Sequence, residues 1–168
     1  VHRKRLKKIQ KYVHFPPVET RLLDIGCNMG TFLQLAKEQG YLITGVEPDG
    51  NAVEAGLRSG LDIRCGYLHE INLGDARYDI VTLFEVVEHL EDPTGLLKEC
   101  HRILKPGGFL CMTTGNARSW TVKFLKGKWD YFDLKFGHIS FFNPASIRTI
   151  ARNSKFDIIR VQTISVWL

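Results

Sequence analysis

The chain has 168 residues, of which 44% are hydrophobic and 24% charged, proportions typical of one globular domain that exclude a disordered or collagen-like chain. The net charge of +5 comes from 23 Lys and Arg against 18 Asp and Glu, and six of the cations lie within the first eleven residues. We expect one domain over residues 1–168 with a solvated, basic, helical lead-in at residues 1–20. The remainder is close to neutral, so we expect no nucleic-acid partner.

Apolar runs of strand length alternate with helix-length patterns along the chain. The predicted strands are residues 22–26, 41–46, 61–65, 79–84, 108–114 and 156–161, and the predicted helices are residues 31–39, 51–59, 93–104 and 143–151. This alternation indicates βαβ units. We predict an α/β fold with a Rossmann-like, doubly wound, mostly parallel sheet and helices on both of its faces.

The predicted helices carry start and stop signals. Asp49 and Asp92 are candidate N-caps, and Pro93 suits the first position of the helix that follows. Gly40 and Gly60 follow the ends of two helices, where glycine is favoured. These signals support the order of the elements.

The four cysteines contain no Cys-x-x-Cys pair and each lies in or beside an apolar stretch, so we expect buried thiols in a reducing compartment. They are Cys27, Cys65, Cys100 and Cys111. No apolar run reaches the length of a membrane helix, and the basic N-terminus is not followed by the apolar core of a signal peptide. We predict no membrane span and a cytoplasmic location.

The regular pattern stops in the segment 115–142, where residues 120–142 hold eight of the eighteen aromatic residues. Ligands of open α/β sheets bind at the carboxyl ends of the strands, and this segment follows the fifth predicted strand. Two interpretations remain open. The segment is either a lid or substrate-binding element, or an apolar excursion packed on its own domain.

A turn of chemical interest follows the first predicted strand. Gly26 and Gly30 place no side chain between the backbone and a ligand, and the N–H groups at the start of the next helix are available to it. Glu47 ends the second strand, 21 residues after Gly26, where a carboxylate can accept hydrogen bonds from both hydroxyls of a ribose. The two features together predict an adenosine-type cofactor.

The turn lacks the dinucleotide fingerprint Gly-x-Gly-x-x-Gly, because Asn28 stands in the middle position, and this disfavours NAD. Four stretches instead resemble class I S-adenosylmethionine-dependent methyltransferases, in the branch of the ubiquinone-biosynthesis O-methyltransferases and related small-molecule enzymes. They read LLDIGCNMG at 22–30, GVEPD at 45–49, FEVVEHL at 84–90 and LKPGG at 104–108. That family usually has seven strands, so we expect the last strand to be missing or to begin within residues 162–168.

The resemblance implies S-adenosylmethionine as cofactor and assigns its surroundings residue by residue. The methionine part would lie near the first motif, the ribose on Glu47, the adenine near Tyr67, and the fourth strand end would line the site. The residues that we assign to the cofactor are Asp24, Gly26, Cys27, Asn28, Gly30, Glu47, Pro48, Tyr67, Leu68, Phe84, Glu85 and Val86.

Methyl transfer is an in-line displacement, so the enzyme mainly aligns the reactants, and a base is needed only where the acceptor carries a proton. Candidates for that base are Glu88, His89 and His138, with Tyr131 a further side chain in the aromatic segment. A second interpretation assigns Glu88 and His89 to the turn before the next helix, and His138 to packing of the aromatic segment.

The Glu-x-x-Glu-His spacing leaves a metal site open as an alternative. Glu85, Glu88, His89 and a later His138 offer oxygen and nitrogen ligands. The string resembles the metal site of small-RNA terminal 2′-O-methyltransferases. Our main prediction is nevertheless methyl transfer to a hydroxyl oxygen of a small-molecule acceptor, without a metal. The alternatives are a metal-assisted RNA 2′-O-methyltransferase and a cofactor-binding module without catalysis.

Overall fold

A computed structural model describes residues 1–117 and 137–163 of the protein, and its backbone divides into two compact units. The first unit consists of Val1–Phe84 and Arg102–Met112, and the second of Glu85–His101 and Thr113–Leu168. The single domain expected over residues 1–168 stays a prediction. Each unit is described below by itself.

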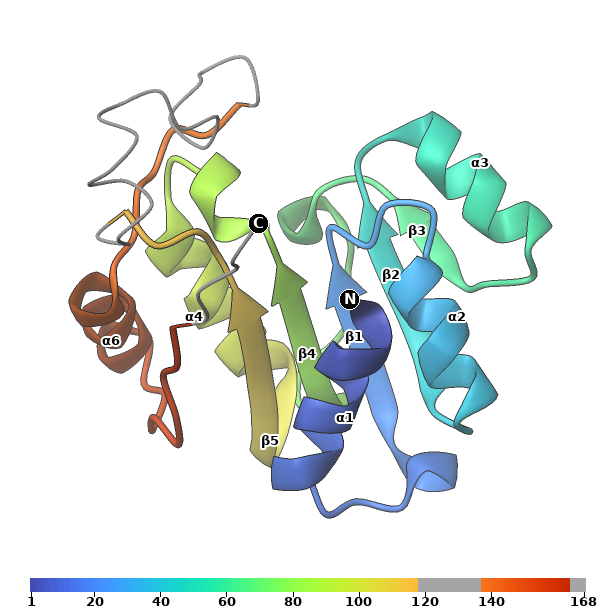
Figure 1. Ribbon diagram of the computed structural model, residues 1–168. Helices are drawn as coiled ribbons and strands as arrows, with labels where there is room; N and C mark the ends of the chain where they lie inside the picture. Colours follow the sequence, from blue (N-terminus) through green and yellow to red (C-terminus); the bar gives the residue numbers. More distant parts are fainter. Residues whose placement is uncertain (118–136, 164–168) are drawn as a thin grey trace. The chain divides into compact units, whose positions relative to one another are not determined.

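The first unit is built on a five-stranded sheet in the order β3-β2-β1-β4-β5 (Figure 1). The strands are β1 (Arg21–Ile25), β2 (Leu42–Glu47), β3 (Ile63–Cys65), β4 (Tyr78–Phe84) and β5 (Leu104–Thr113). β1 lies at the centre and pairs in parallel with β2 and β4, and β2 pairs in parallel with β3. The Rossmann-like fold is confirmed, with five strands in the described part of the chain.

The sixth predicted strand, residues 156–161, is wrong: these residues have irregular backbone. The N–H of Phe156 donates to the carbonyl of Ala151, 3.0 Å away, and thereby closes the end of the preceding helix. The Phe156 ring packs edge-on against His101 at 5.4 Å. The apolar side chain is thus used to hold a helix end. Of the seventh strand expected within 162–168, residues 162 and 163 are not in a strand and the others lie outside the described residues.

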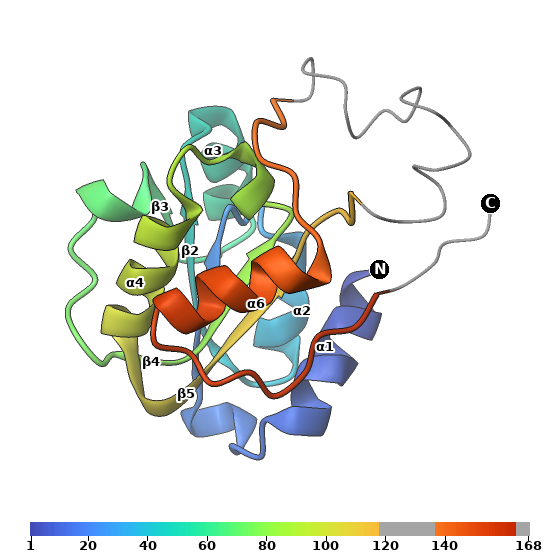
Figure 2. The ribbon, with the colours of Figure 1, turned by 90° about the vertical axis from the view of Figure 1, so that its left-hand side faces the viewer.

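Three α-helices belong to the first unit: α1 (His2–Tyr12), α2 (Thr31–Glu38) and α3 (Gly50–Arg58). Figures 1 and 2 show α1 and α2 on the same face of the sheet. The predicted cap of α3 is confirmed, because the Asp49 carboxylate accepts from the N–H of Asn51 at 2.9 Å. In the described part of the chain, 3-10 turns lie at Pro17–Glu19, Leu68–Glu70 and Val87–His89, the last in the second unit.

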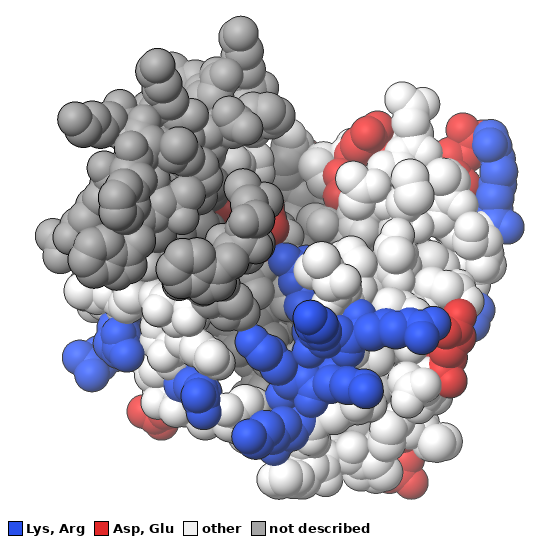
Figure 3. Space-filling model, viewed as in Figure 1, with Lys and Arg blue, Asp and Glu red and all other residues white. Residues whose placement is uncertain are grey.

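The basic lead-in is the helix α1, and only part of it is solvated. Leu6 and Ile9 are 5% exposed and belong to the same apolar cluster as Phe32 and Leu33 of α2. The opposite side carries exposed cations that gather over α1 in Figure 3, namely Arg3, Lys4, Lys7, Lys8 and Lys11. The helix is predicted correctly, but it is part of the core.

The second unit contains α6 (Pro144–Asn153) and most of α4 (Pro93–Ile103) (Figure 2). The predicted N-cap of α4 is confirmed, because the Asp92 carboxylate accepts from the N–H of Gly95 at 2.8 Å. Ser154, just after α6, donates its hydroxyl to the carbonyl of Thr94 in α4. No helix within residues 1–117 and 137–163 is long and apolar enough to cross a membrane.

Two further expectations concern the cysteines and the segment 115–142. Cys27 and Cys100 are buried thiols as expected, and Cys111 is half-buried. Cys65 is exposed, because it is the last residue of the edge strand β3. The lid or substrate segment 115–142 has residues 118–136, including Tyr131, outside the described residues.

Candidate functional site

The loop between β1 and α2 has a turned backbone that brings main-chain groups to the carboxyl end of the sheet. Gly26, Asn28 and Gly30 all have positive φ, of 71°, 51° and 83°. The N–H groups of Gly26 and Cys27 both donate to the carbonyl of Val46 on β2, at 2.8 and 3.3 Å. A Cβ at Gly30 would stand 2.4 Å from the side chain of Leu61, and together with the positive φ this favours glycine there.

Glu47 connects this loop to the turn that follows β2. The side chain is 9% exposed, and its two carboxylate oxygens accept from the N–H groups of Asn28 and Asp49, at 2.8 and 3.0 Å. A carboxylate offers about four lone-pair positions, so each oxygen can accept a further hydrogen bond. Glu47 therefore holds the loop in place and still offers acceptors for a pair of hydroxyls. Pro48 follows it and is exposed.

Asp24 lies on β1, buried to 3% exposure. The hydroxyl of Thr82 on β4 donates to its carboxylate at 2.5 Å. Burial raises the pKa of Asp24 to about 7, the negative charge of Glu47 adds to the rise, and the Thr82 hydrogen bond and the charge of Arg5 oppose it. The site thus contains a carboxyl group that a nearby cation would hold ionised.

Arg5 lies near Asp24 and is a candidate site residue that the sequence did not reveal. Helix α1 brings its guanidinium 4.5 Å above the ring of Phe84, at the end of β4, and close enough to Asp24 to lower the pKa of that carboxyl. Phe84 is half-buried and packs edge-on against Phe32 of α2 at 4.9 Å. The signal in the sequence was the spacing of Leu6, Ile9 and Val13, which is that of a helix with one apolar side.

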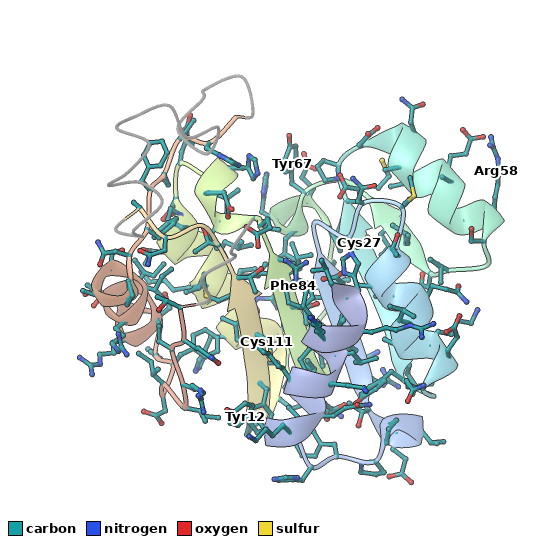
Figure 4. All side chains as sticks on the ribbon, in the orientation of Figure 1. Tyr12, Cys27, Arg58, Tyr67, Phe84 and Cys111 are labelled. Atoms are coloured by element: carbon teal, nitrogen blue, oxygen red, sulfur yellow. The ribbon has the colours of Figure 1, made fainter. Side chains whose placement is uncertain are left out.

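The loops after β1 and β3 also supply a sulfur group and an aromatic group, and Figure 4 shows Cys27 and Tyr67 at this edge of the sheet. Tyr67 follows β3, is 55% exposed and stacks on His69, while Leu68 is buried beneath. Burial, with the charges of Asp24 and Glu47, raises the pKa of the Cys27 thiol to about 12. Cys27 is therefore a packing group, and Tyr67 offers a flat surface to a ligand.

The second unit begins at Glu85, directly after β4, so Glu85 and Val86 remain predictions as cofactor residues. Glu85 has a φ of 59° and accepts from the Thr113 hydroxyl at 2.7 Å. Glu88 is fully buried. Burial, together with the charge of Glu85, raises the pKa of Glu88 to about 7, and hydrogen bonds from its own backbone and from Thr114 oppose the rise.

Both predicted histidines lie together in this second unit. The rings of His89 and His138 are 4.7 Å apart, and Nδ1 of His89 lies 3.1 Å from the carbonyl oxygen of Gly137. A carbonyl oxygen only accepts, so Nδ1 of His89 carries the proton and Nε2 is the nitrogen able to take one up. The carbonyl of Glu88 accepts from the N–H groups of Ile139 and Ser140. The Glu88–His89 turn therefore also holds residues 137–140.

The alternative metal set is Glu85, Glu88, His89 and His138. Within the part of the chain that the structure describes, no three His, Cys, Asp or Glu side chains are arranged to hold a metal ion. Each of these residues has a geometric role of its own in the turn, as described above.

Comparison with known proteins agrees with this arrangement. A family model described as a methyltransferase domain matches residues 1–161. The chain belongs to the methyltransferase domain family. The resemblance to S-adenosylmethionine-dependent methyltransferases is thereby confirmed. A ubiquinone biosynthesis O-methyltransferase of Bradyrhizobium diazoefficiens is 38% identical over 106 residues, which are 60% of this chain and 41% of that protein.

Two solved structures have the same fold as this methyltransferase-family chain. A SAM-dependent methyltransferase from Archaeoglobus fulgidus has a TM-score of 0.75 at 24% identity, over 94% of this chain and 70% of that one. The [4+2]-cyclase SpnF has a TM-score of 0.77 at 20% identity, over 95% of this chain and 58% of that one. The chain spans about two fifths of the length of the Bradyrhizobium relative. The fold is shared with a protein described as a cyclase, so the fold alone does not name the reaction.

Proposed function

We propose that this chain is the cofactor-binding core of an S-adenosylmethionine-dependent methyltransferase that methylates a hydroxyl oxygen of a small molecule. The observation that carries the proposal is Glu47, a buried carboxylate at the end of β2 whose two oxygens already orient the glycine-bearing loop. The site residues around it fit the cofactor group by group.

The amino-acid end of the cofactor is a zwitterion, and the first unit has one charged residue for each of its charges. Arg5 would hold the carboxylate, because its guanidinium is a fixed fork of donors. Asp24 would receive the ammonium group, which would keep this buried carboxyl ionised. Glu47 would accept from the ribose hydroxyls, and exposed Tyr67 would lie against the adenine.

When bound, the cofactor supplies a methyl group on a positively charged sulfur. The residues of the chain would fix the position of that methyl group, since Arg5 and Asp24 would bind the amino-acid end of the cofactor and Glu47 would bind its ribose. Alignment of this kind can lower a displacement barrier by several kcal/mol, about 7–11 in favourable cases. The protein has to add a proton acceptor only for a hydroxyl acceptor.

We assign the proton of the acceptor hydroxyl to Nε2 of His89. Its other ring nitrogen donates to Gly137, which fixes the tautomer, and the side chain is exposed. Glu88 is fully buried, so we assign it a positioning role: it holds the turn through its carbonyl. His138 would orient the His89 ring from 4.7 Å.

Two considerations support an oxygen acceptor of low molecular weight. The Bradyrhizobium relative bears the name O-methyltransferase. Six of the 23 Lys and Arg residues lie in residues 1–11, and the rest of the chain has 17 cations against 18 acids, so a long nucleic-acid acceptor has little to bind. A cytoplasmic location remains our expectation.

Calorimetric titration with S-adenosylmethionine, S-adenosylhomocysteine and NAD tests the proposal. We expect the first two to bind at micromolar concentration and NAD not to bind. Glu47→Ala should weaken their binding by about 100-fold, from the loss of two charge-assisted hydrogen bonds. The matched control is Glu54→Ala, an exposed glutamate of α3 that pairs with Arg58. Binding of NAD alone, or equal binding by both variants, would overturn the proposal.

A second measurement addresses the acceptor. Transfer of a labelled methyl group to phenols, alcohols, amines and RNA should favour a hydroxyl compound, and His89→Ala should lower kcat by about 100-fold without changing cofactor affinity. Binding of the cofactor without transfer to any of these acceptors would favour a module that has no catalysis of its own. Transfer to RNA that requires a divalent ion would favour the metal-assisted alternative.

A further inference from the structure

The first unit has a groove on the face of the sheet away from α1 and α2. Ile43 and Ile63 pack on the apolar cluster that those two helices cover, and side chains alternate along a strand. Thr44 and Arg64, their neighbours on β2 and β3, therefore point to the other face, where they line the groove. The groove has a volume of about 470 Å³, within the range of small-molecule sites.

Three arginines line this groove: Arg21 at the start of β1, Arg64 on β3 and Arg77 just before β4. All three are exposed, and none of their guanidinium groups has a hydrogen bond or ion pair within the described residues. Asp62 is the acid among the lining residues, and the Thr44 hydroxyl donates to it at 3.2 Å. Three cations against one acid leave the groove with a charge of +2.

The acids that could neutralise these arginines are paired elsewhere. Asp75 forms an ion pair with Arg102. Asp79 pairs with Lys105 at 2.7 Å and also accepts from the backbone N–H of Arg21. The sequence around Arg77 has acids on both sides, yet the fold directs them to other cations. The positive charge of the groove is therefore a product of the fold.

The loop that carries Arg77 is held in a defined shape. The N–H of Gly74 donates to Oδ1 of Asn72 at 3.1 Å. The N–H groups of Ala76 and Arg77 donate to the carbonyls of Arg102 and Ile103, at 3.0 and 2.8 Å. The side-chain NH₂ of Asn72, which also lines the groove, remains a donor. The wall of the groove is thus built from fixed backbone and presents the Asn72 donor near Arg77.

The groove is separate from the proposed cofactor site. The groove residues of β2 end at Thr44, three residues before Glu47, and Arg64 is in register with Val46, one residue before Glu47. Side chains alternate along a strand, so Thr44 and Arg64 point to the face of the sheet opposite to Glu47. A ligand in the groove would therefore leave Glu47, Asp24 and the glycine-bearing loop accessible.

We propose that this groove binds a small organic phosphate with two or three phosphate groups. Guanidinium forks match phosphate oxygens in pairs, and three of them around one concave site suit a ligand with several charges. Asp62 and Thr44 offer polar contacts to an uncharged hydroxyl or amine part of the same molecule. The small volume favours this ligand over a long chain, whose charges would lie mostly outside the groove.

Inorganic triphosphate is the probe for the test, with affinity measured by calorimetry on the full chain with and without S-adenosylhomocysteine. We expect a dissociation constant below 1 mM in both cases, by analogy with multiply charged ligands on unpaired arginines. Arg64→Ala combined with Arg77→Ala should weaken binding by at least about tenfold. The matched control, Lys7→Ala with Lys8→Ala, removes the same charge from α1 and should change binding less than about twofold.

The lysine pair Arg64→Lys with Arg77→Lys keeps the charge and guards against a folding defect in the alanine pair. It should retain part of the affinity, with a circular dichroism spectrum like that of the original chain. Absence of binding at 10 mM triphosphate, or equal weakening by the α1 control, overturns the proposal. Displacement by S-adenosylhomocysteine would also overturn it, as would binding of a 20-nucleotide RNA but not of triphosphate.

Discussion

Asp24 in the first unit and Glu88 in the second are both buried carboxyl groups whose pKa is raised to about 7, mainly by burial. Their surroundings differ. Asp24 accepts from the Thr82 hydroxyl and lies near the cation Arg5, whereas Glu88 has the acid Glu85 near it and no cation among the groups that shift its pKa. The cation near Asp24 offsets part of the cost of ionising that buried carboxyl group, whereas the acid near Glu88 adds to the cost.

The comparison implies different responses to a ligand. A bound ammonium group would pair with Asp24 in its ionised form, and Arg5 nearby would pair with the carboxylate of the same ligand. Glu85 and Thr114 are the other side chains that shift the pKa of Glu88. The backbone carbonyl of Glu88 makes the contacts that hold the turn. Three measurements can break or sharpen this contrast.

Of these three measurements, the largest effect is expected at Arg5. Arg5→Ala removes the cation of the first unit's charged pair, and we expect S-adenosylhomocysteine to bind about 10–30 times more weakly, the usual cost of one hydrogen bond to a charged group. Calorimetric titration measures the loss. Arg3→Ala, an exposed arginine two residues earlier on the same helix, is the control and should change affinity less than twofold by charge alone. Equal losses would mean that α1 acts only through its net charge.

Arg5 also shows where prediction from sequence stops. The order of strands and helices, the caps at Asp49 and Asp92 and the position of Glu47 follow from local patterns, because each depends on residues close together in the chain. Arg5 reaches Phe84 from 79 residues away, and Thr82 reaches Asp24 from 58. Such partners depend on how helices and strands pack, which no local pattern contains.

The sixth strand shows the same limit from the other side. Residues 156–161 have the apolar content of a strand, yet a strand also needs a partner for its backbone groups. The N–H of Phe156 closes α6 instead. The three groove arginines were likewise ordinary charges in the sequence, since they come from three separate parts of the chain and line one groove only in the fold.

The second measurement is the pH dependence of cofactor binding. In the free protein the pKa of Asp24 is about 7, and a bound ammonium group would favour the ionised form and lower that pKa. Binding must then release a proton at low pH, so affinity for S-adenosylhomocysteine should fall as pH falls through 7. We expect a loss of about tenfold between pH 8 and pH 6.

Asp24→Asn is the control for this profile. The amide cannot ionise but can still accept from Thr82, so binding should be weaker at pH 8 and flat between pH 8 and pH 6. An unchanged slope in the variant would assign the pH dependence to another group and would remove the proposed ammonium contact. The corresponding substitution Glu88→Gln should leave the slope as it is in the original chain.

The smallest effect concerns Glu88 and the stability of the fold. Its pKa is about 7 in the folded protein and 4.5 for an ordinary glutamate. The folded state therefore binds a proton that the unfolded state has lost in that window, and the stability from this group declines as pH rises from about 4.5 to 7. Glu88→Gln removes the ionisation. The melting temperature of Glu88→Gln should therefore exceed that of the original chain by about 3–6 °C more at pH 8 than at pH 5.

Asp24 has the same sign of shift, so part of the slope should remain in Glu88→Gln and disappear only when Asp24→Asn is added. Glu91→Gln, an exposed glutamate three residues along, should leave the melting profile unchanged. A variant Glu88→Gln that melts lower than the original chain at pH 8 would contradict the prediction. It would show that the ionised carboxylate has a stabilising partner in the folded protein, and Glu88 would then resemble Asp24 rather than differ from it.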